Sequence, residues 1–132
     1  MFAMPQLRVA RTVRRPACSD YLREGLSDLA GRQGLSASVT SEVGVGGDMR
    51  SSLAAVEAVG HRLTLSKDAT TISYGAYADS LLVTARRSPR SPANDQVLVW
   101  LHQADYTLEQ TGEWDTFGMR GTCSPGFKLR AQ

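Results

Sequence analysis

Short extended segments separated by turn residues are the feature of this chain that most limits its fold. Residues 80–86 include the uncharged run Leu-Leu-Val, and residues 97–101 read Val-Leu-Val-Trp-Leu. Continuous apolar runs of this length are typical of strands that are buried on both faces. Residues 86–95 lie between the two segments and contain Pro89 and Pro92, so they predict an exposed loop.

A hairpin is the better interpretation of residues 51–65, where the signal is mixed. Ala54, Ala55 and Ala58 favour a helix by propensity. Gly60, followed by an alternating pattern of side chains, favours two strands joined by a tight turn. We therefore expect a hairpin at this place.

Five more segments carry strand signals, which brings the total to seven to nine short strands. They are rich in β-branched, aromatic or hydroxyl side chains, or they alternate in polarity. They cover residues 35–42, 70–74, 106–108, 114–119 and 127–129. This pattern predicts an all-β fold, a small antiparallel β-barrel or sandwich.

One short helix precedes these strands. Apolar residues recur at helical spacing over residues 19–33, and Ser19 or Asp20 is a suitable capping residue. Gly31 or Gly34 would end the helix. Because one short helix buries little surface alone, we expect it to pack on the strands.

Length and charge distribution indicate one β-domain that follows a basic start. The chain has 132 residues, which suits a single domain. We assign residues 1–34 to a basic tail with the short helix, and residues 35–132 to the β-domain. Residues 1–19 contain only basic charges, a bias shared by mitochondrial transit peptides. Since the segment is poor in serine and has no clear amphipathic face, we interpret it as a basic tail.

Composition argues against several classes of function. The net charge of +2 is too small to indicate a nucleic acid or an anionic membrane as partner. No apolar run is long enough to cross a bilayer. The two cysteines, Cys18 and Cys123, set no disulfide framework and are most simply free thiols in a reducing compartment, so we expect a cytoplasmic location.

Residues 113–127 form the most distinctive string, Glu-Trp-Asp-Thr-Phe-Gly-Met-Arg-Gly-Thr-Cys-Ser-Pro-Gly-Phe. Its glycines and its proline would break a helix. Two further strings lie upstream. Residues 40–48 read Thr-Ser-Glu-Val-Gly-Val-Gly-Gly-Asp, and residues 67–79 contain Ile72-Ser73 and Ala78-Asp79. No general requirement of a globular fold explains the three strings in this order.

Together, the three strings resemble motifs of the middle β-domain of acyl-CoA dehydrogenases. That family typically has Thr-Glu-Pro before a glycine-rich turn closed by Ser-Asp. A Lys, an aromatic residue, Ile and Thr or Ser follow, and then a Trp before Leu- or Phe-Gly-Met-Arg. The resemblance covers about residues 35–132 and does not extend to residues 1–34. It implies FAD as the cofactor and acyl-CoA as the substrate.

The resemblance also implies roles for particular residues. Hydroxyl and main-chain groups of residues 38–41 would meet the pyrimidine edge of the flavin ring, and Ser73 would place its hydroxyl near the reactive flavin nitrogen. Main-chain amides around Gly46 and Gly47 would face a phosphate or the thioester of acyl-CoA. Without the resemblance, Thr40 and Ser73 are ordinary strand hydroxyls that bond neighbouring backbone. The implied cofactor-binding residues are Ser38, Val39, Thr40, Ser41, Gly46, Gly47, Thr71, Ile72 and Ser73, and Gly47 is also implied to bind substrate.

Three positions depart from the family's pattern. Thr71 stands where an aromatic residue usually packs on the flavin, so the wall beside the ring is thinner. Gly47 replaces a serine, which removes one hydroxyl contact to the ligand. Lys67 lies two residues farther from Ile72 than is usual in the family.

No other group of residues suggests catalysis or metal binding. His61 and His102 do not form a metal pair with either cysteine at known ligand spacing. Nothing in the spacing brings Glu57 and Glu113 together as paired carboxylates. Basic surroundings would suit a reactive thiol at Cys123, but we expect a buried, inert cysteine there. We therefore assign no catalytic residue and no metal site.

The resemblance implies only part of an enzyme. The family's reaction is the α,β-dehydrogenation of an acyl-CoA, in which a proton is abstracted and a hydride passes to FAD. The base is generally a Glu in a C-terminal helical domain. The expected function is therefore the positioning of FAD and acyl-CoA, by a fragment or a part of a split enzyme that is inactive alone. The implied partners are acyl-CoA, a chain that carries the helical domains, or a second copy.

A different class of function stays open beside this one. The surface that meets helical domains in the family would be exposed and apolar here. Such a patch would bind a partner protein or self-associate. The chain would then be a non-catalytic interaction module or the remnant of a gene.

Overall fold

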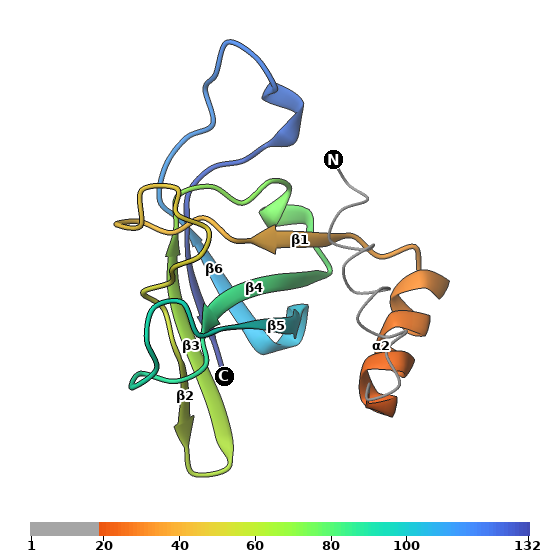
Figure 1. Ribbon diagram of the computed structural model, residues 1–132. Helices are drawn as coiled ribbons and strands as arrows, with labels where there is room; N and C mark the ends of the chain where they lie inside the picture. The colour runs from red at the N-terminus through yellow and green to blue at the C-terminus, as the bar shows by residue number, and fades with distance from the viewer. Residues whose placement is uncertain (1–18) are drawn as a thin grey trace.

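Seven strands, one α-helix and three short 3-10 turns make up this computed structural model, which describes residues 19–132 (Figure 1). The helix is α2 (Asp20–Gly31), and the 3-10 turns are η1 (Gly75–Tyr77), η2 (Gln103–Asp105) and η3 (Arg120–Thr122). The strands are β1 (Ser36–Val39), β2 (Val56–Val59), β3 (Arg62–Ala69), β4 (Ser80–Arg86), β5 (Gln96–His102), β6 (Tyr106–Gln110) and β7 (Phe127–Ala131).

The strands form two sheets that pack against each other. The order is β1-β4-β5 in the first sheet and β2-β3-β7-β6 in the second. In Figure 1 the strands of the first sheet run across those of the second. Over residues 19–132 the strands do not close into a barrel, so the predicted all-β fold is confirmed in its sandwich form, with one N-terminal helix.

Among the named strands of residues 19–132, pairing is antiparallel except between β1 and β4. β1 and β4 run parallel, with Ser36 opposite Ser80 and Val39 opposite Val83. A long connection that includes β2 and β3 separates them, as a parallel pair requires. The predicted antiparallel arrangement holds for the other four pairs in the described part of the chain.

The main core lies between the two sheets. Val39 and Leu81 from the first sheet meet Phe127 and Leu129 from the second, and each is at most 3% exposed. The other face of β4 is covered as well, because Leu82 packs against Trp100 and against two leucines of α2, Leu22 and Leu26. The helix therefore packs on the strands, as expected.

Burial on both faces explains why β4 is a continuous apolar run. Leu81, Leu82 and Val83 are all at most 3% exposed, which confirms the prediction for this segment. The same prediction is wrong for β5, where Leu98 is 44% exposed. β5 is an edge strand of its sheet, and most of its residues are only partly buried.

The second sheet is covered on one face only, and its sequence alternates accordingly. In β7, Phe127, Leu129 and Ala131 are buried, whereas Lys128 and Arg130 are exposed. Alternation of this kind is typical of a sheet with one face on the core and one in solvent. The predicted strand at residues 127–129 is thus confirmed and extends to residue 131.

The hairpin predicted within residues 51–65 is confirmed. β2 and β3 pair antiparallel, with Val59 opposite Arg62. Gly60 and His61 form the two-residue turn between them, and Gly60 has a positive φ of 62°. Loops of this length need a positive φ at the first central residue, which glycine adopts without strain.

Residues 70–74 were predicted to be a strand and form a loop instead. β3 ends at Ala69. Ile72 is fully buried in the loop, and its N–H donates to the carbonyl of Pro125 at 3.1 Å. The N–H of Tyr74 donates to the carbonyl of Thr122 at 3.0 Å. The segment is therefore held by the buried side chain of Ile72 and by hydrogen bonds to residues 122–125, and not by hydrogen bonds to a neighbouring strand.

The strand predicted at residues 114–119 is also a loop. Its polar groups bond locally: Trp114 Nε1 donates to the carbonyl of Met119 at 3.3 Å, and Thr116 Oγ1 donates to that of Gly118 at 2.6 Å. Local bonds from side chain to backbone compete with sheet pairing. The loop extends away from the sheets at the top of Figure 1.

No helix in the part of the chain that the structure describes could cross a membrane. The only α-helix among residues 19–132 is α2, which has 12 residues.

Candidate functional site

The loops that carry the three motif strings gather in one region of the sandwich. Residues 40–49 and residue 70 surround a hollow of about 560 Å³, which we call the glycine-turn hollow. Gly46 and Gly47 have φ angles of 64° and 88°, a region that favours glycine. A Cβ added at either residue would meet no atom within 4 Å. Their main chain therefore borders open space, where a ligand can approach it closely.

Asp48 closes the glycine turn. Its carboxylate accepts hydrogen bonds from the Ser51 hydroxyl at 2.7 Å and from the Arg50 N–H at 3.0 Å. These bonds, that of Ser51 first, hold the pKa of Asp48 below its ordinary value. Asp48 is accordingly a weak proton acceptor at neutral pH.

A second carboxylate, Glu42, is buried and fixes the start of the same loop. It accepts hydrogen bonds from the N–H of Ala54 at 2.5 Å, the N–H of Leu53 at 3.1 Å and the hydroxyl of Ser52 at 2.8 Å. The Nζ of Lys67 lies 3.6 Å from Glu42 Oε2, and these two side chains are 0% and 6% exposed, respectively. The ion pair ties the glycine turn to β3.

Lys67 points from β3 into the core, where lysine is rarely found without a partner. Besides facing Glu42, its Nζ donates to the carbonyl of Thr84 at 2.7 Å and to Thr84 Oγ1 at 3.2 Å. Burial lowers the pKa of Lys67 from its ordinary value of 10.5, and the charge of Glu42 opposes part of that shift.

We expect the buried Lys67 to make stability depend on pH in the alkaline range. Its pKa in the folded protein lies below the unfolded value of 10.5. Between these two values the unfolded chain binds more protons, so stability rises with pH. Urea unfolding of the wild type and of Lys67→Met, from about pH 7 to about pH 10, measures the effect. The wild type should gain stability relative to the variant as pH rises, and a difference that stays constant contradicts the prediction.

Ser41 and Thr71 connect two of the motif strings. The Ser41 hydroxyl donates to the Thr71 carbonyl at 2.7 Å and accepts from the Thr71 N–H at 3.1 Å. One side chain therefore satisfies both main-chain groups of a residue 30 positions away. This contact holds the end of the first motif against the second.

A second hollow adjoins the first at this contact. It has a volume of about 480 Å³, and we call it the Trp114 hollow. Five of its lining side chains carry hydroxyl groups, and one is the indole of Trp114. The lining residues are Thr71, Ser73, Trp114, Thr116, Gly118, Met119, Thr122 and Ser124.

A chain of hydroxyl groups forms the base of the Trp114 hollow. The Ser124 hydroxyl, in a residue that is 3% exposed, lies 2.9 Å from Ser73 Oγ and 2.8 Å from Thr122 Oγ1. Thr122 Oγ1 donates to the carbonyl of Met119 at 2.9 Å. Ser73 is thus held by a residue 51 positions later in the chain.

Six of the nine predicted cofactor-binding residues line the two hollows. Thr40, Ser41, Gly46 and Gly47 line the glycine-turn hollow, and Thr71 and Ser73 line the Trp114 hollow.

The other three present no side chain to either hollow. The side chains of Val39 and Ile72 are fully buried in the core. Ser38 lies opposite Leu82, whose side chain packs against α2, so Ser38 points to the helix-covered face of the sheet. These three residues can offer only main-chain groups to a ligand.

Sequence reasoning missed five residues that shape the site. Trp114, Thr122 and Ser124 line the second hollow, and their presence in the most distinctive string of the sequence was the available signal. The buried pair of Glu42 and Lys67 was also missed. The only available signal for this pair was the presence of Glu42 in the first motif string and of Lys67 at the start of the second.

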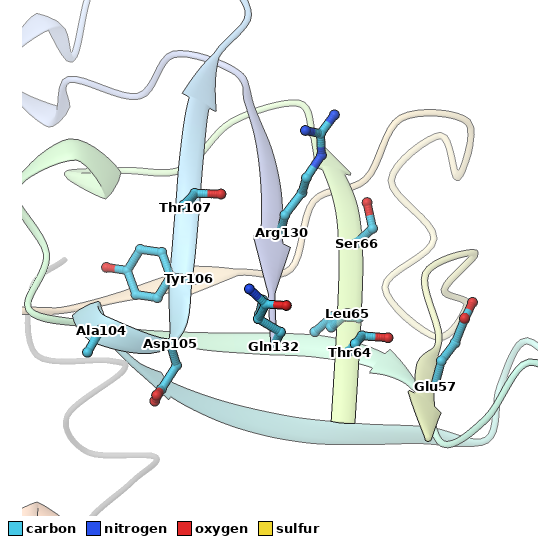
Figure 2. A pocket seen from close by; sticks show the side chains of 11 residues that line it. Glu57, Thr64, Leu65, Ser66, Ala104, Asp105, Tyr106, Thr107, Arg130 and Gln132 are labelled. Atoms are coloured by element: carbon cyan, nitrogen blue, oxygen red, sulfur yellow. The ribbon is translucent and has the colours of Figure 1, made fainter. Parts of the chain in front are cut away.

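A third hollow, of about 550 Å³, lies on the outer face of the second sheet and contains none of the predicted site residues. Figure 2 shows Arg130 on β7 between Thr107 on β6 and Ser66 on β3. We call this third hollow the outer-sheet hollow. Glu57 of β2 lines it, whereas Glu113, the other carboxylate considered above, belongs to the loop after β6 and does not. The hollow is lined by polar side chains such as Arg130 and by apolar ones such as Leu65 and Ala131.

Cys123 is exposed, which corrects the expectation of a buried cysteine. It follows η3, a turn at the surface, and has a φ of 42°. Cys18 and the basic tail lie outside the described residues. Over residues 19–132, no three His, Cys, Asp or Glu side chains gather in a way that could hold a metal ion.

The two adjoining hollows are lined by groups that suit a ligand, and no described carboxylate in their lining is free. They offer hydroxyls, bare main-chain amides and one indole ring, which suits a planar heterocycle with a polar edge. The carboxylates that line them are Glu42 and Asp48, and both are engaged by donors of their own loop. We find no described residue at this site that is placed to abstract a proton from a ligand.

The sequence matches no family model and no curated protein. Solved structures do resemble the chain. One is an FAD-dependent dehydrogenase, with a TM-score of 0.71, 18% identity, and coverage of 99% of this chain and 33% of that chain. A second is the acyl-CoA dehydrogenase from Geobacillus kaustophilus, with a TM-score of 0.72, 16% identity, and coverage of 94% and 33%.

A third similar structure is a glutaryl-coenzyme A dehydrogenase in complex with glutaryl-CoA. Its TM-score is 0.66 at 17% identity, and the match covers 93% of this chain and 31% of that chain. The resemblance to acyl-CoA dehydrogenases is thus confirmed at the level of the fold. The chain spans about a third of the length of these proteins.

Proposed function

We propose that the chain positions FAD and acyl-CoA as the middle β-domain of an acyl-CoA dehydrogenase-type flavoprotein. The observation that carries the proposal is the contact between Ser41 and Thr71, which joins the two hollows and two of the motif strings. The bond between Ser124 and Ser73 adds the third string. The shared fold supports the same reading. A cytoplasmic location is part of the proposal, because the exposed thiol of Cys123 suits a reducing compartment.

Each residue has a definite task in this proposal. The main chain of residues 38–41 and the hydroxyl of Thr40 contact the polar edge of the flavin ring. When Ser124 donates its proton to Ser73, the Ser73 hydroxyl keeps its own proton for a ring nitrogen. Gly46 and Gly47 offer amides to a phosphate or to the acyl-CoA thioester. Bound FAD would supply the hydride acceptor of the reaction.

In this proposal, the catalytic base has to come from groups other than the carboxylates of the two hollows. Dehydrogenation of an acyl-CoA requires a base, and the carboxylates at this site are already engaged. In this proposal the base comes from outside the described residues, for example from helical domains, a partner chain or a second copy. The chain alone should bind the cofactor without turning over substrate.

Titration of the purified chain with FAD, followed by flavin fluorescence, tests this function. We expect saturable binding, and Ser41→Ala should weaken it about fivefold or more, because a main-chain clamp at the site is lost. Ser66→Ala, in the outer-sheet hollow, is the matched control and should leave the affinity unchanged. Addition of acyl-CoA with an electron-accepting dye should give no dye reduction. Absence of saturable binding, or turnover by the chain alone, contradicts the proposal.

A non-catalytic interaction module is the second candidate, and exposed apolar side chains favour it. Val43, Met49 and Leu53 around the glycine turn are 56%, 65% and 56% exposed, and Phe117 is fully exposed. Such residues mark contact surfaces when they lie close together. This alternative expects self-association on gel filtration without any FAD binding.

A further inference from the structure

The Trp114 hollow is lined by both hydroxyl and apolar groups. Thr71 and Ser73 bring main-chain and hydroxyl groups from the loop after β3. Trp114 and Met119 bring apolar side chains from the loop after β6. A flat conjugated ring with a polar edge needs both kinds of neighbour, because its edge requires hydrogen-bond partners and its faces require apolar contact.

Trp114 is held in a defined orientation. Its indole N–H donates to the carbonyl of Met119 at 3.3 Å, and the same carbonyl accepts a hydrogen bond from Thr122 Oγ1. Through Thr122 and Ser124, the carbonyl is connected to the hydroxyl of Ser73. The indole and the Ser73 hydroxyl therefore belong to one bonded unit.

Backbone strain is concentrated around this hollow. Among residues 19–132, four residues other than glycine have a positive φ, and three of them lie here: Tyr74 at 59°, Met119 at 56° and Cys123 at 42°. Tyr74 follows Ser73 and donates its N–H to Thr122. Strained positions cluster where a site is built for a ligand.

We propose that Trp114 is the aromatic wall of the flavin site, against which one face of the flavin ring packs while Thr71 and Ser73 contact its edge. This inference rests on the proposed function and assigns the ring's neighbour within it. Stacking on an aromatic side chain favours a planar heterocycle whatever its substituents. Trp114 should therefore contribute to the binding of riboflavin as much as to that of FAD.

The two tryptophans of the chain permit a controlled test. Trp114→Ala should weaken the binding of both FAD and riboflavin by about tenfold or more, because base-sized rings gain that much from one aromatic contact. Trp114→Phe should bind nearly as tightly as the wild type. Trp100→Phe is the matched control, since Trp100 packs against Leu82 and α2 and should not affect flavin affinity. The remaining emission of Trp100 in Trp114→Ala reports that the fold is intact.

An aromatic side chain at a second position of the same hollow makes the test specific. Thr71→Phe added to Trp114→Ala should restore most of the lost affinity, because residue 71 lines the same hollow and bonds Ser41 through its main chain. Equal flavin affinity in the wild type and a folded Trp114→Ala overturns the inference and leaves the proposed function standing. Failure of the wild type to bind any flavin overturns both.

Discussion

Glu42→Ala is expected to lower the free energy of unfolding by about 3–5 kcal/mol. The substitution leaves the ammonium of Lys67, which is 0% exposed, without its counter-charge. It also leaves the amides of Leu53 and Ala54 without an acceptor. Removal of one partner of a buried pair is more damaging than loss of the pair, because an uncompensated charge stays in the core. Urea unfolding followed by circular dichroism measures the change.

The loss of unfolding free energy should be larger for the buried ion pair than for an exposed one. Lys67→Met should destabilise less than Glu42→Ala, because Glu42 keeps three hydrogen-bond donors after Lys67 is lost. Asp95→Ala removes the exposed ion pair with Arg87 and should cost less than about 1 kcal/mol. A loss in Glu42→Ala as small as that in Asp95→Ala would show that the buried pair does not hold the glycine turn.

Ile72→Ala should lower the free energy of unfolding by about 2–5 kcal/mol. Ile72 is fully buried, and its side chain fixes the loop that carries Thr71 and Ser73. An alanine leaves a cavity beneath that loop. The packing around Ile72 is tight, because a Cβ added at Gly75 would lie 2.9 Å from Ile72 Cγ2. Urea unfolding gives the measured loss.

Two matched variants calibrate this result. Ile72→Val removes one methylene group and should cost only about 0.5–1.5 kcal/mol. Leu63→Ala removes an apolar side chain of the β2–β3 hairpin that is 64% exposed, and should change stability by about 0.5 kcal/mol or less. If Ile72→Ala costs no more than Leu63→Ala, Ile72 does not anchor the loop.

Elements with strong local patterns could be predicted from the sequence. The uncharged run of β4, the alternation of β7 and the turn at Gly60 each carry their own signal. The strand prediction for residues 70–74 was wrong because β-branched residues also suit a loop that is anchored by one buried isoleucine. The parallel pairing of β1 with β4 could not be predicted, since it depends on a connection that passes through the other sheet.

The site was predictable only where its residues lie within the motifs. Ser41, Thr71 and Ser73 lie around the two hollows, as the motif strings suggested. The ion pair of Lys67 with Glu42 escaped prediction because lysine is rarely buried, and no local pattern marks an inward lysine on a strand. The contact of Ser124 with Ser73 joins residues from distant loops and has no signature in either loop alone.

Whether the two loop hollows form a flavin site can be tested by mapping backbone amide chemical shifts as FAD is added to the isotope-labelled chain. We expect the shifted amides to cluster in residues 38–48, 71–73 and 114–124, and those of the β2–β3 hairpin to stay unchanged. Shifts confined to the outer-sheet hollow around Arg130, or no shift at saturating FAD, would contradict the claim that the two loop hollows form a flavin site.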